Sequence, residues 1–177
     1  MKQFKFVFLC LALFIFQTTL NAQLFYNSGV TITVNNGSLF VDGAVQNESG
    51  QIDVDDINSE MIIKGNFVNN DIAGGDGYYR VSGNWVNNNT FNAGSGTVFL
   101  EGAAQFLDGS VSTTFFNLTL NGTGSKTQTI DQYCDGVLSL NNIELKTEAF
   151  GFYVENTSVS AITLGTGFVS SVKLSVI

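Results

Sequence analysis

The chain has 177 residues and a formal net charge of −8, with 15 acidic residues against seven basic ones. This acidic balance argues against nucleic acid or anionic lipid as a partner, because both bind basic patches. The sequence contains no histidine, which excludes histidine-based triads and histidine-containing metal sites.

Residues 1–22 have the pattern of a secretory signal peptide. Two lysines stand among the first five residues, residues 6–16 form an apolar run, and a polar stretch ends at Ala22. The run is too short to cross a bilayer core, which takes about 20 apolar residues, so we predict cleavage after Ala22. The expected product is a single secreted or cell-surface domain, residues 23–177, without a membrane span. Cys134 is then its only cysteine, so no internal disulfide is possible. We expect a small core residue, with an intermolecular disulfide as the alternative.

Beyond residue 22 a strand motif recurs six times. Each copy has two apolar residues on either side of an outward position, followed by a corner, and successive corners lie 22, 18, 19, 20 and 20 residues apart. A fixed period near 20 residues is typical of a solenoid whose units bury their apolar faces on their neighbours. The absence of proline agrees, because nearly every strand of such a stack is paired on both sides. The copies are residues 39–43, 61–65, 79–83, 98–102, 118–122 and 138–142.

The alternation within the motif separates a core face from a solvent face. The positions four and two residues before the corner are apolar or aromatic in every copy, so we expect two inward columns. The first column is Leu39, Met61, Tyr79, Val98, Leu118 and Leu138, and the second is Val41, Ile63, Val81, Leu100, Leu120 and Leu140. The position between them varies in chemistry, as solvent-facing positions do.

These observations predict an all-β fold, a right-handed parallel β-helix (β-solenoid) with rungs about 20 residues long and about 4.8 Å apart. No segment beyond residue 22 has a sustained helical period, so essentially no helix is expected. The alternative is an antiparallel β-sandwich, for which Asn121-Gly122 and Asp135-Gly136 would be good hairpin turns. The constant register of the motif favours the solenoid, because hairpins do not require it.

An asparagine recurs after the corner of several units. Asn47, Asn69 and Asn87 share one register, so stacking would place their amides in a ladder in which each donates to the next. Asparagine also tolerates the left-handed backbone of tight corners. We therefore favour a structural role for these residues over ligand binding.

Residues 83–102 and 115–120 carry a longer pattern. They read Gly-Asn-Trp, an Asn-rich turn, Phe-Asn-Ala-Gly-Ser-Gly-Thr-Val, and then Phe-Phe-Asn-Leu. This pattern resembles repeats of large exported surface proteins of Bacteroidetes-type bacteria, which use type IX secretion. The resemblance is best over residues 65–140. It implies a parallel β-helix, a surface or secreted setting and an adhesin-like role, and it brings no catalytic residues with it.

Carboxylates are the remaining candidates for catalysis. Glycoside hydrolysis needs two of them within about 5 to 10 Å across a groove, and Glu101, Asp108 and Asp131 could approach one another on adjacent turns. A solvated acidic surface is the favoured interpretation, so we assign no catalytic residues.

Three carboxylates within four residues form the best candidate for a calcium site. They are Asp53, Asp55 and Asp56. Calcium takes about six to eight hard oxygen ligands, often from short acidic loops that contain glycine. A solvated loop is the alternative, and we expect no other cofactor.

One outward column is the best candidate for a surface that contacts glycans or surface proteins. Apolar side chains stacked on a solvent-facing side of a solenoid form a strip that often marks a binding site. The alternative is that a loop around Phe115 and Phe116 folds back and covers the strip. The column consists of Phe40, Ile62, Arg80 and Phe99.

The leading hypothesis for function is a structural or adhesin-like β-solenoid without catalytic activity. The alternative is a carbohydrate-binding or carbohydrate-cleaving β-helix. The repeat, together with the lack of a convergent catalytic set, favours the first.

The strand-like run at residues 169–177 carries no recognisable cap. Open solenoid ends tend to pair with other strands. We therefore expect either self-association through this end or a longer protein of which the chain is the N-terminal part.

Overall fold

The computed structural model describes residues 23–171, which contain twenty β-strands and no helix. There is accordingly no helix in this part of the chain that could cross a membrane. The predicted signal peptide, residues 1–22, and the last part of the C-terminal run, residues 172–177, lie outside the described residues.

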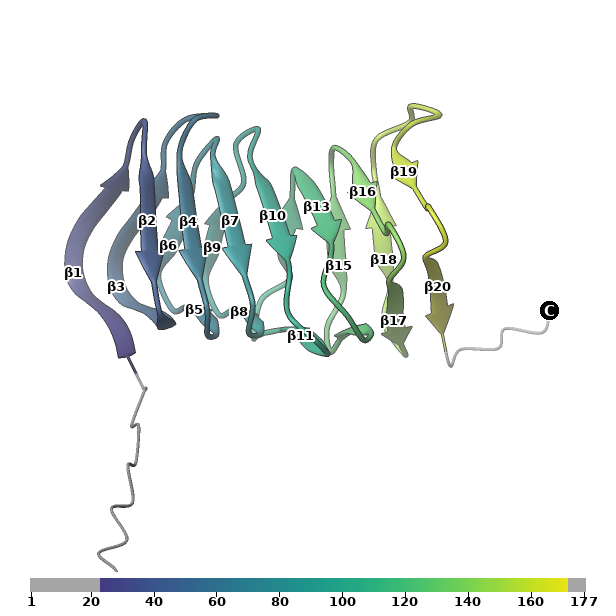
Figure 1. The fold of residues 1–177 in the computed structure, drawn as a ribbon, viewed down its shortest axis with the longest axis horizontal. Coiled ribbons are helices and arrows are strands. Elements are labelled where there is room, and N and C mark those ends of the chain that lie inside the picture. The colour runs from purple at the N-terminus through teal and green to yellow at the C-terminus, as the bar shows by residue number, and fades with distance from the viewer. Residues whose placement is uncertain (1–22, 172–177) are drawn as a thin grey trace, which may run out of the picture.

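The strands stack into one parallel β-solenoid, as predicted. Every strand pair is parallel, and paired residues lie about 20 positions apart in the chain. The antiparallel sandwich is therefore wrong. The stack begins with β1 (Gln23–Val34) and ends with β20 (Phe168–Ser171), at opposite ends of the molecule (Figure 1).

Three sheets form the sides of the solenoid. The seven-stranded sheet has the order β19 (Ile162–Thr163), β16 (Leu138–Ser139), β13 (Asn117–Leu120), β10 (Thr97–Leu100), β7 (Tyr78–Val81), β4 (Glu60–Ile63) and β2 (Ser38–Val41). The ten-stranded sheet has the order β20, β17 (Glu144–Glu148), β14 (Lys126–Gln128), β11 (Gln105–Asp108), β8 (Trp85–Asn87), β5 (Phe67–Asn69), β3 (Gly43–Val54), β6 (Ile72–Gly74) and β9 (Thr90–Asn92), with β1 also paired to β3. The third sheet consists of β12 (Thr114–Phe115), β15 (Gln132–Cys134) and β18 (Phe152–Val154).

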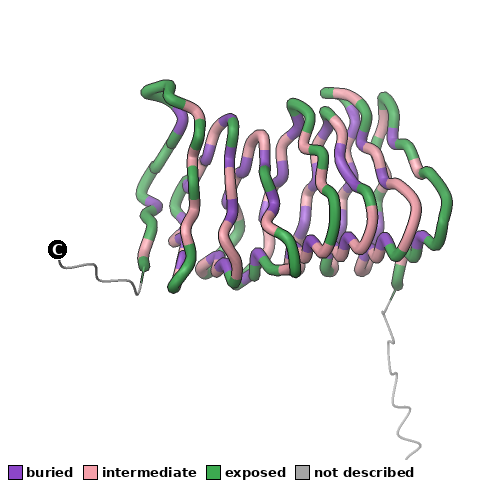
Figure 2. Tube along the Cα trace, turned by 180° about the vertical axis from the view of Figure 1, so that it is seen from behind, coloured by how far each residue is buried: buried purple, intermediate pink, exposed green. Residues whose placement is uncertain are grey.

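The two inward columns of the seven-stranded sheet form the core that the motif predicts. Every residue of the second column is buried, and in the first column only Leu39, on the terminal strand β2, is partly exposed. Tyr79, Val98 and Leu118 show the stacking, since they pair in register on three successive turns. Burial of each such side chain contributes about 1.5–3 kcal/mol. Cys134 is also buried, as expected. The alternation of buried and exposed positions continues around the turns (Figure 2).

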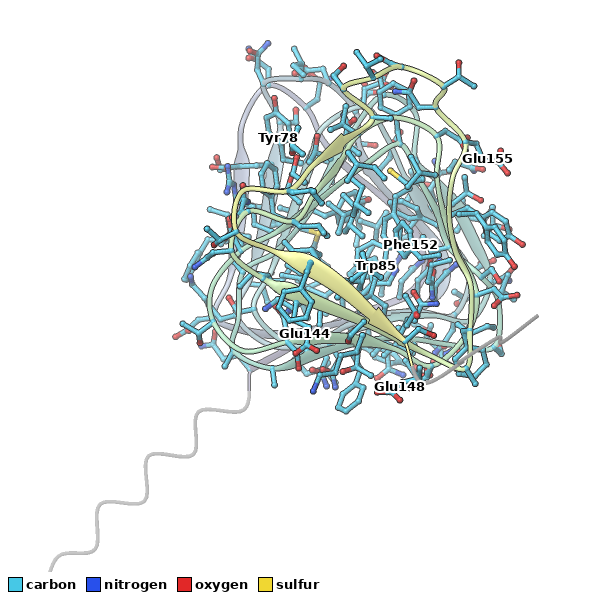
Figure 3. The ribbon with its side chains drawn as sticks, turned by 90° about the vertical axis from the view of Figure 1, so that its right-hand side faces the viewer. Tyr78, Trp85, Glu144, Glu148, Phe152 and Glu155 are labelled. Atoms are coloured by element: carbon cyan, nitrogen blue, oxygen red, sulfur yellow. The ribbon has the colours of Figure 1, made fainter. Side chains whose placement is uncertain are left out.

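Aromatic side chains fill the middle of the solenoid. Trp85 stacks on Phe67 with ring centroids 4.6 Å apart and meets Phe91 edge-on at 4.9 Å. Tyr79 meets Phe67 edge-on at 5.4 Å. Both geometries are favoured by the charge distribution of aromatic rings. The indole Nε1 of Trp85 donates a 3.1 Å hydrogen bond to Thr113 Oγ1, so burial leaves this polar atom satisfied. Seen along the stack, Trp85 lies inside the three sides (Figure 3).

The asparagine ladder is confirmed and has one more member than predicted. Nδ2 of Asn27 donates to Oδ1 of Asn47 at 2.8 Å. The same bond joins Asn47 to Asn69, and Asn69 to Asn87, each at 2.9 Å. The ladder ends at Asn87, whose Nδ2 is buried without a hydrogen-bond partner in the described residues. Gly109 follows on the next turn with φ +139°, and a Cβ there would lie 1.8 Å from the Asn87 carbonyl oxygen, so no side chain can extend the ladder.

A lysine is buried at one corner of the solenoid. Nζ of Lys126 donates hydrogen bonds to the carbonyl oxygens of Ala103 and Gly102, at 2.7 and 2.9 Å, and to Oε1 of Gln105 at 2.7 Å. The same Oε1 accepts a bond from the backbone N–H of Gly102. Burial of the ammonium group lowers the pKa of Lys126 to about 8. The motif did not predict this charge in the interior.

Candidate functional site on the outer face of the seven-stranded sheet

The predicted strip lies on the outer face of the seven-stranded sheet. Phe40, Ile62, Arg80 and Phe99 pair in one register on β2, β4, β7 and β10, so their side chains stack from turn to turn. They alternate with buried residues and therefore point away from the core. Phe40 is 56 % exposed, and the other three are partly exposed. These four residues are called the outer strip below.

Arg80 is the polar centre of the outer strip. Its Nε lies 3.0 Å from Oε2 of Glu60, and its Nη1 lies 2.5 Å from Oε1 of Glu101. The guanidinium carbon lies 4.3 Å from the ring centroid of Phe99. Because all three charged side chains are partly exposed, each ion pair contributes only about 0–1 kcal/mol to stability. The contacts matter more for orientation, since they hold the guanidinium over one face of Phe99.

Two further side chains approach the rings of the outer strip. Tyr78, which pairs with Glu60 on the neighbouring strand, meets Phe99 edge-on at 5.8 Å. Nζ of Lys64 lies 5.9 Å from the ring centroid of Phe40. Each ring therefore has one charged neighbour, while the ring of Phe40 keeps most of its surface open to solvent.

At the N-terminal end, the outer strip borders two adjacent open hollows of about 290 and 420 Å³. Gln23 and Leu24 of β1 line both hollows. Phe40 lines the smaller hollow, and Asp42 and Lys64 line the larger. Both hollows are open to solvent and lie along β1 and β2, at the N-terminal edge of the solenoid.

Phe115 and Phe116 do not cover the outer strip. Phe115, on β12, is fully buried, with its ring centroid 5.6 Å from that of Trp85. Phe116 lies at the corner before β13, where its carbonyl oxygen accepts hydrogen bonds from the N–H of Gly136 and from Sγ of Cys134. The covering-loop alternative is therefore wrong, because the first of these rings belongs to the core and the second residue belongs to a corner.

The three carboxylates considered for glycoside hydrolysis are not brought together. Glu101 follows β10 in the seven-stranded sheet, Asp108 ends β11 in the ten-stranded sheet, and Asp131 precedes β15 in the third sheet. Each has its own partner, since Asp108 accepts from Oγ1 of Thr129 and Asp131 accepts from the N–H of Gly151. The set therefore offers no pair that could act on one glycosidic bond.

The three predicted calcium ligands lie at the end of β3 and in the turn after it. Oδ2 of Asp55 accepts a 2.8 Å hydrogen bond from Nδ2 of Asn35, and Oδ1 of Asp56 accepts from a backbone N–H of its own turn. Desolvation, together with the charges of Asp55 and Asp76, raises the pKa of Asp53. The described part of the chain has no cluster of three or more acidic or cysteine side chains arranged to hold a metal ion. Calcium binding therefore stays a prediction.

Comparisons with known proteins do not assign a family. No protein-family model, no curated protein and no solved structure matches the chain. A functional argument therefore starts from the geometry of the outer strip.

Proposed function

We propose that the protein is a secreted or cell-surface β-solenoid with a structural or adhesin-like, non-enzymatic role, and that the outer strip is its contact surface. The observation that carries the proposal is the in-register row of aromatic and aliphatic side chains on a solvent-facing sheet, with Phe40 more than half exposed. Exposed apolar rows with a polar rim are typical of binding surfaces. The predicted signal peptide supports the extracellular setting.

Glycans are the ligand class that we assign to this surface. Phe40 offers an open ring surface on which the apolar face of a sugar could pack. Farther along the same face of the sheet, Glu60, Arg80 and Glu101 supply acceptors and donors for hydroxyl groups. Such a combination of apolar area with a few oriented polar groups is typical of ligand sites. Because neighbouring strands lie about 4.8 Å apart, an extended chain lying along the axis would touch several turns at once.

Binding without cleavage is favoured over a carbohydrate-cleaving role. Glu101 is engaged by Arg80, and the two other carboxylates considered for catalysis lie on other sheets. The surface therefore has groups that could orient a sugar, but the considered set lacks the paired carboxylates that hydrolysis needs.

A glycan array and a polysaccharide depolymerisation assay on the purified protein test this proposal. We expect binding to at least one glycan class without turnover. Phe40→Ala should weaken that binding about tenfold, which corresponds to about 1.4 kcal/mol. Phe106→Ala is the matched control, because Phe106 is a half-exposed phenylalanine on the ten-stranded sheet. Measurable turnover would contradict the non-enzymatic role, and equal binding by both variants would contradict the assignment of the outer strip.

A further inference from the structure

Both ends of the described solenoid are open strand edges. Among the described strands, β1 and β2 pair on one side only, and at the other end so do β18, β19 and residues 168–170 of β20. An unpaired edge presents a row of N–H and C=O groups that can template another strand. Figure 1 places the two edges at opposite ends of the stack, and Figure 3 looks onto the C-terminal one.

The strands of the two end turns carry no charged residue, although Asp42 follows β2 and Glu155 follows β18. Residues 23–41 and residues 156–171 contain no Asp, Glu, Lys or Arg, whereas all 15 acidic residues lie between Asp42 and Glu155, these two included. Charged side chains on the edge are a common protection against strand pairing. The acidic residues that make two copies of this protein repel each other are therefore sparse in the turns that would meet end to end, where only Asp42 and Glu155 stand.

At both ends of the seven-stranded sheet, side chains of the inward column are exposed, and they stand in the same register. One inward column runs in unbroken pairing from Leu39 on β2 to Ile162 on β19. The residues between them are buried, but Leu39 is partly exposed and Ile162 is 46 % exposed. Leu164 continues the second column beyond Leu140 and is 52 % exposed. Each end thus presents apolar side chains that inner turns would cover.

We propose that copies of this chain stack end to end, with the C-terminal turn of one copy on the N-terminal turn of the next. β19 would then pair with β2 of the next copy, and β20 with its β1. A second copy is the occupant that the register favours, because it continues the parallel pairing and places Ile162 on Leu39 and Leu164 on Val41 of the next copy. The backbone irregularity of β1 around Ser28 is no obstacle, since β3 already stacks on β1 across it.

The proposed interface joins two different surfaces, so it does not close on itself. Each added copy leaves one free N-terminal end and one free C-terminal end, and the assembly can grow along the solenoid axis. Growth along this axis would keep the outer strip of every copy on the side of the rod. A stacked copy would cover the two hollows at the N-terminal end, because Gln23 and Leu24 of β1 line both of them. The stacking itself can be tested without knowing what the outer strip binds.

Light scattering of the purified protein over a range of concentrations tests the stacking. We expect the average mass to rise with concentration to at least twice that of one chain. Ile162→Lys combined with Leu164→Lys blocks the C-terminal end, and Leu39→Lys blocks the N-terminal end. Circular dichroism checks that each variant is folded, and Val30→Lys replaces Leu39→Lys if that variant unfolds, because Val30 is an exposed residue of β1.

The blocked variants give a result that non-specific aggregation would not. Each variant alone should stay a single chain, and their equal mixture should form a dimer and nothing larger, because only one compatible pair of ends remains. Phe106→Lys is the control, since Phe106 is as exposed as Ile162 but lies on an inner turn. A protein that stays a single chain at every concentration overturns the proposal. So does a mixture without dimers, or a control that loses association as the end variants do.

Discussion

Nζ of Lys126 donates a 2.7 Å hydrogen bond to Oε1 of Gln105, the residue with which Lys126 pairs on the neighbouring turn. The other close acceptors of the ammonium group are the carbonyl oxygens of Gly102 and Ala103. Neutral oxygens thus hold a cation in the interior. They compensate only part of its desolvation, because burial still lowers the pKa of Lys126 to about 8.

Because Lys126 is buried, the free energy of unfolding should depend on pH in the alkaline range. In the unfolded chain the lysine keeps a pKa near its ordinary value of 10.5, so between pH 8 and pH 10.5 the unfolded state binds more protons than the folded state. The free energy of unfolding should therefore rise with pH across this window, by at most about 1.4 kcal/mol per pH unit. Urea unfolding of the wild type and of Lys126→Met at pH 7.5, 8.5 and 9.5 measures it. Parallel pH profiles for the two proteins would refute the prediction.

Breaking the asparagine ladder in its middle should destabilise the fold. Asn69 accepts from Asn47, donates to Asn87 and donates to the carbonyl oxygen of Thr90. Asn69→Ala leaves buried polar atoms without these partners, so we expect a loss of about 2 kcal/mol or more. Asn70→Ala is the control, because the side-chain hydrogen bonds of Asn70 with Glu48 and Asn88 lie on the partly exposed outer face. Equal losses for the two variants in urea unfolding would contradict a special role for the ladder.

A charge in the inward column should be far more costly than one beside it. Leu100 is fully buried, so Leu100→Asp would place a carboxylate in an apolar core. We expect a loss of about 4 kcal/mol or more in the free energy of unfolding. Thr119→Asp changes an outward residue of the next strand and should cost less than about 1 kcal/mol. If both variants unfold at the same denaturant concentration, the assignment of the inward face is wrong.

The calcium prediction has a direct thermal test. Asp53 is partly desolvated and faces the like charges of Asp55 and Asp76, and a bound cation would relieve both effects. We expect millimolar calcium to raise the melting temperature of the wild type but not of Asp53→Asn, while magnesium serves as the ion control. Asp108→Asn should respond as the wild type does. If calcium leaves the melting temperature of the wild type unchanged, the calcium prediction is wrong.

Six of the seven strands of the seven-stranded sheet could be predicted from the sequence because each of them repeats the same local pattern, whereas β19 was not among the six copies. Leu100 and Leu120, for example, stand two residues before their corners, and the same-face rule for strands then places both in the core. The outer strip follows from the same rule, since Arg80 and Phe99 occupy the intervening position. Periodicity carries this information without knowledge of any contact between turns.

The polar part of the core could not be read in this way. Lys126 and Gln128 occupy inward positions of β14, but their chemistry alone predicts exposure. What keeps Lys126 inside is a set of oxygens from the preceding turn, and alternation within one strand says nothing about oxygens on another. Asn27 was missed for a related reason, because its turn lacks the motif that gave the other ladder residues their register.

The ion pairs of Arg80 could not be predicted from the columns either. Glu60 pairs in register with Tyr78, two positions before Arg80, and Glu101 follows Leu100, the partner of Val81. Both contacts are therefore diagonal, and a diagonal contact depends on how far a side chain reaches. The sequence indicated which residues share a column, but not that a long guanidinium would join neighbouring columns.

The end of the asparagine ladder at Asn87 divides the solenoid mechanically. The ladder's hydrogen bonds run along the stacking axis, so a pull that separates the turns loads each of them directly. The turns up to Asn87 resist such a pull with these amides as well as with their paired strands, whereas Gly109 gives the next turn no amide to contribute. In a stack whose units contact only their neighbours, extension should therefore begin in the turns beyond Asn87. The N-terminal turns would then stay folded while the C-terminal turns unfold and extend.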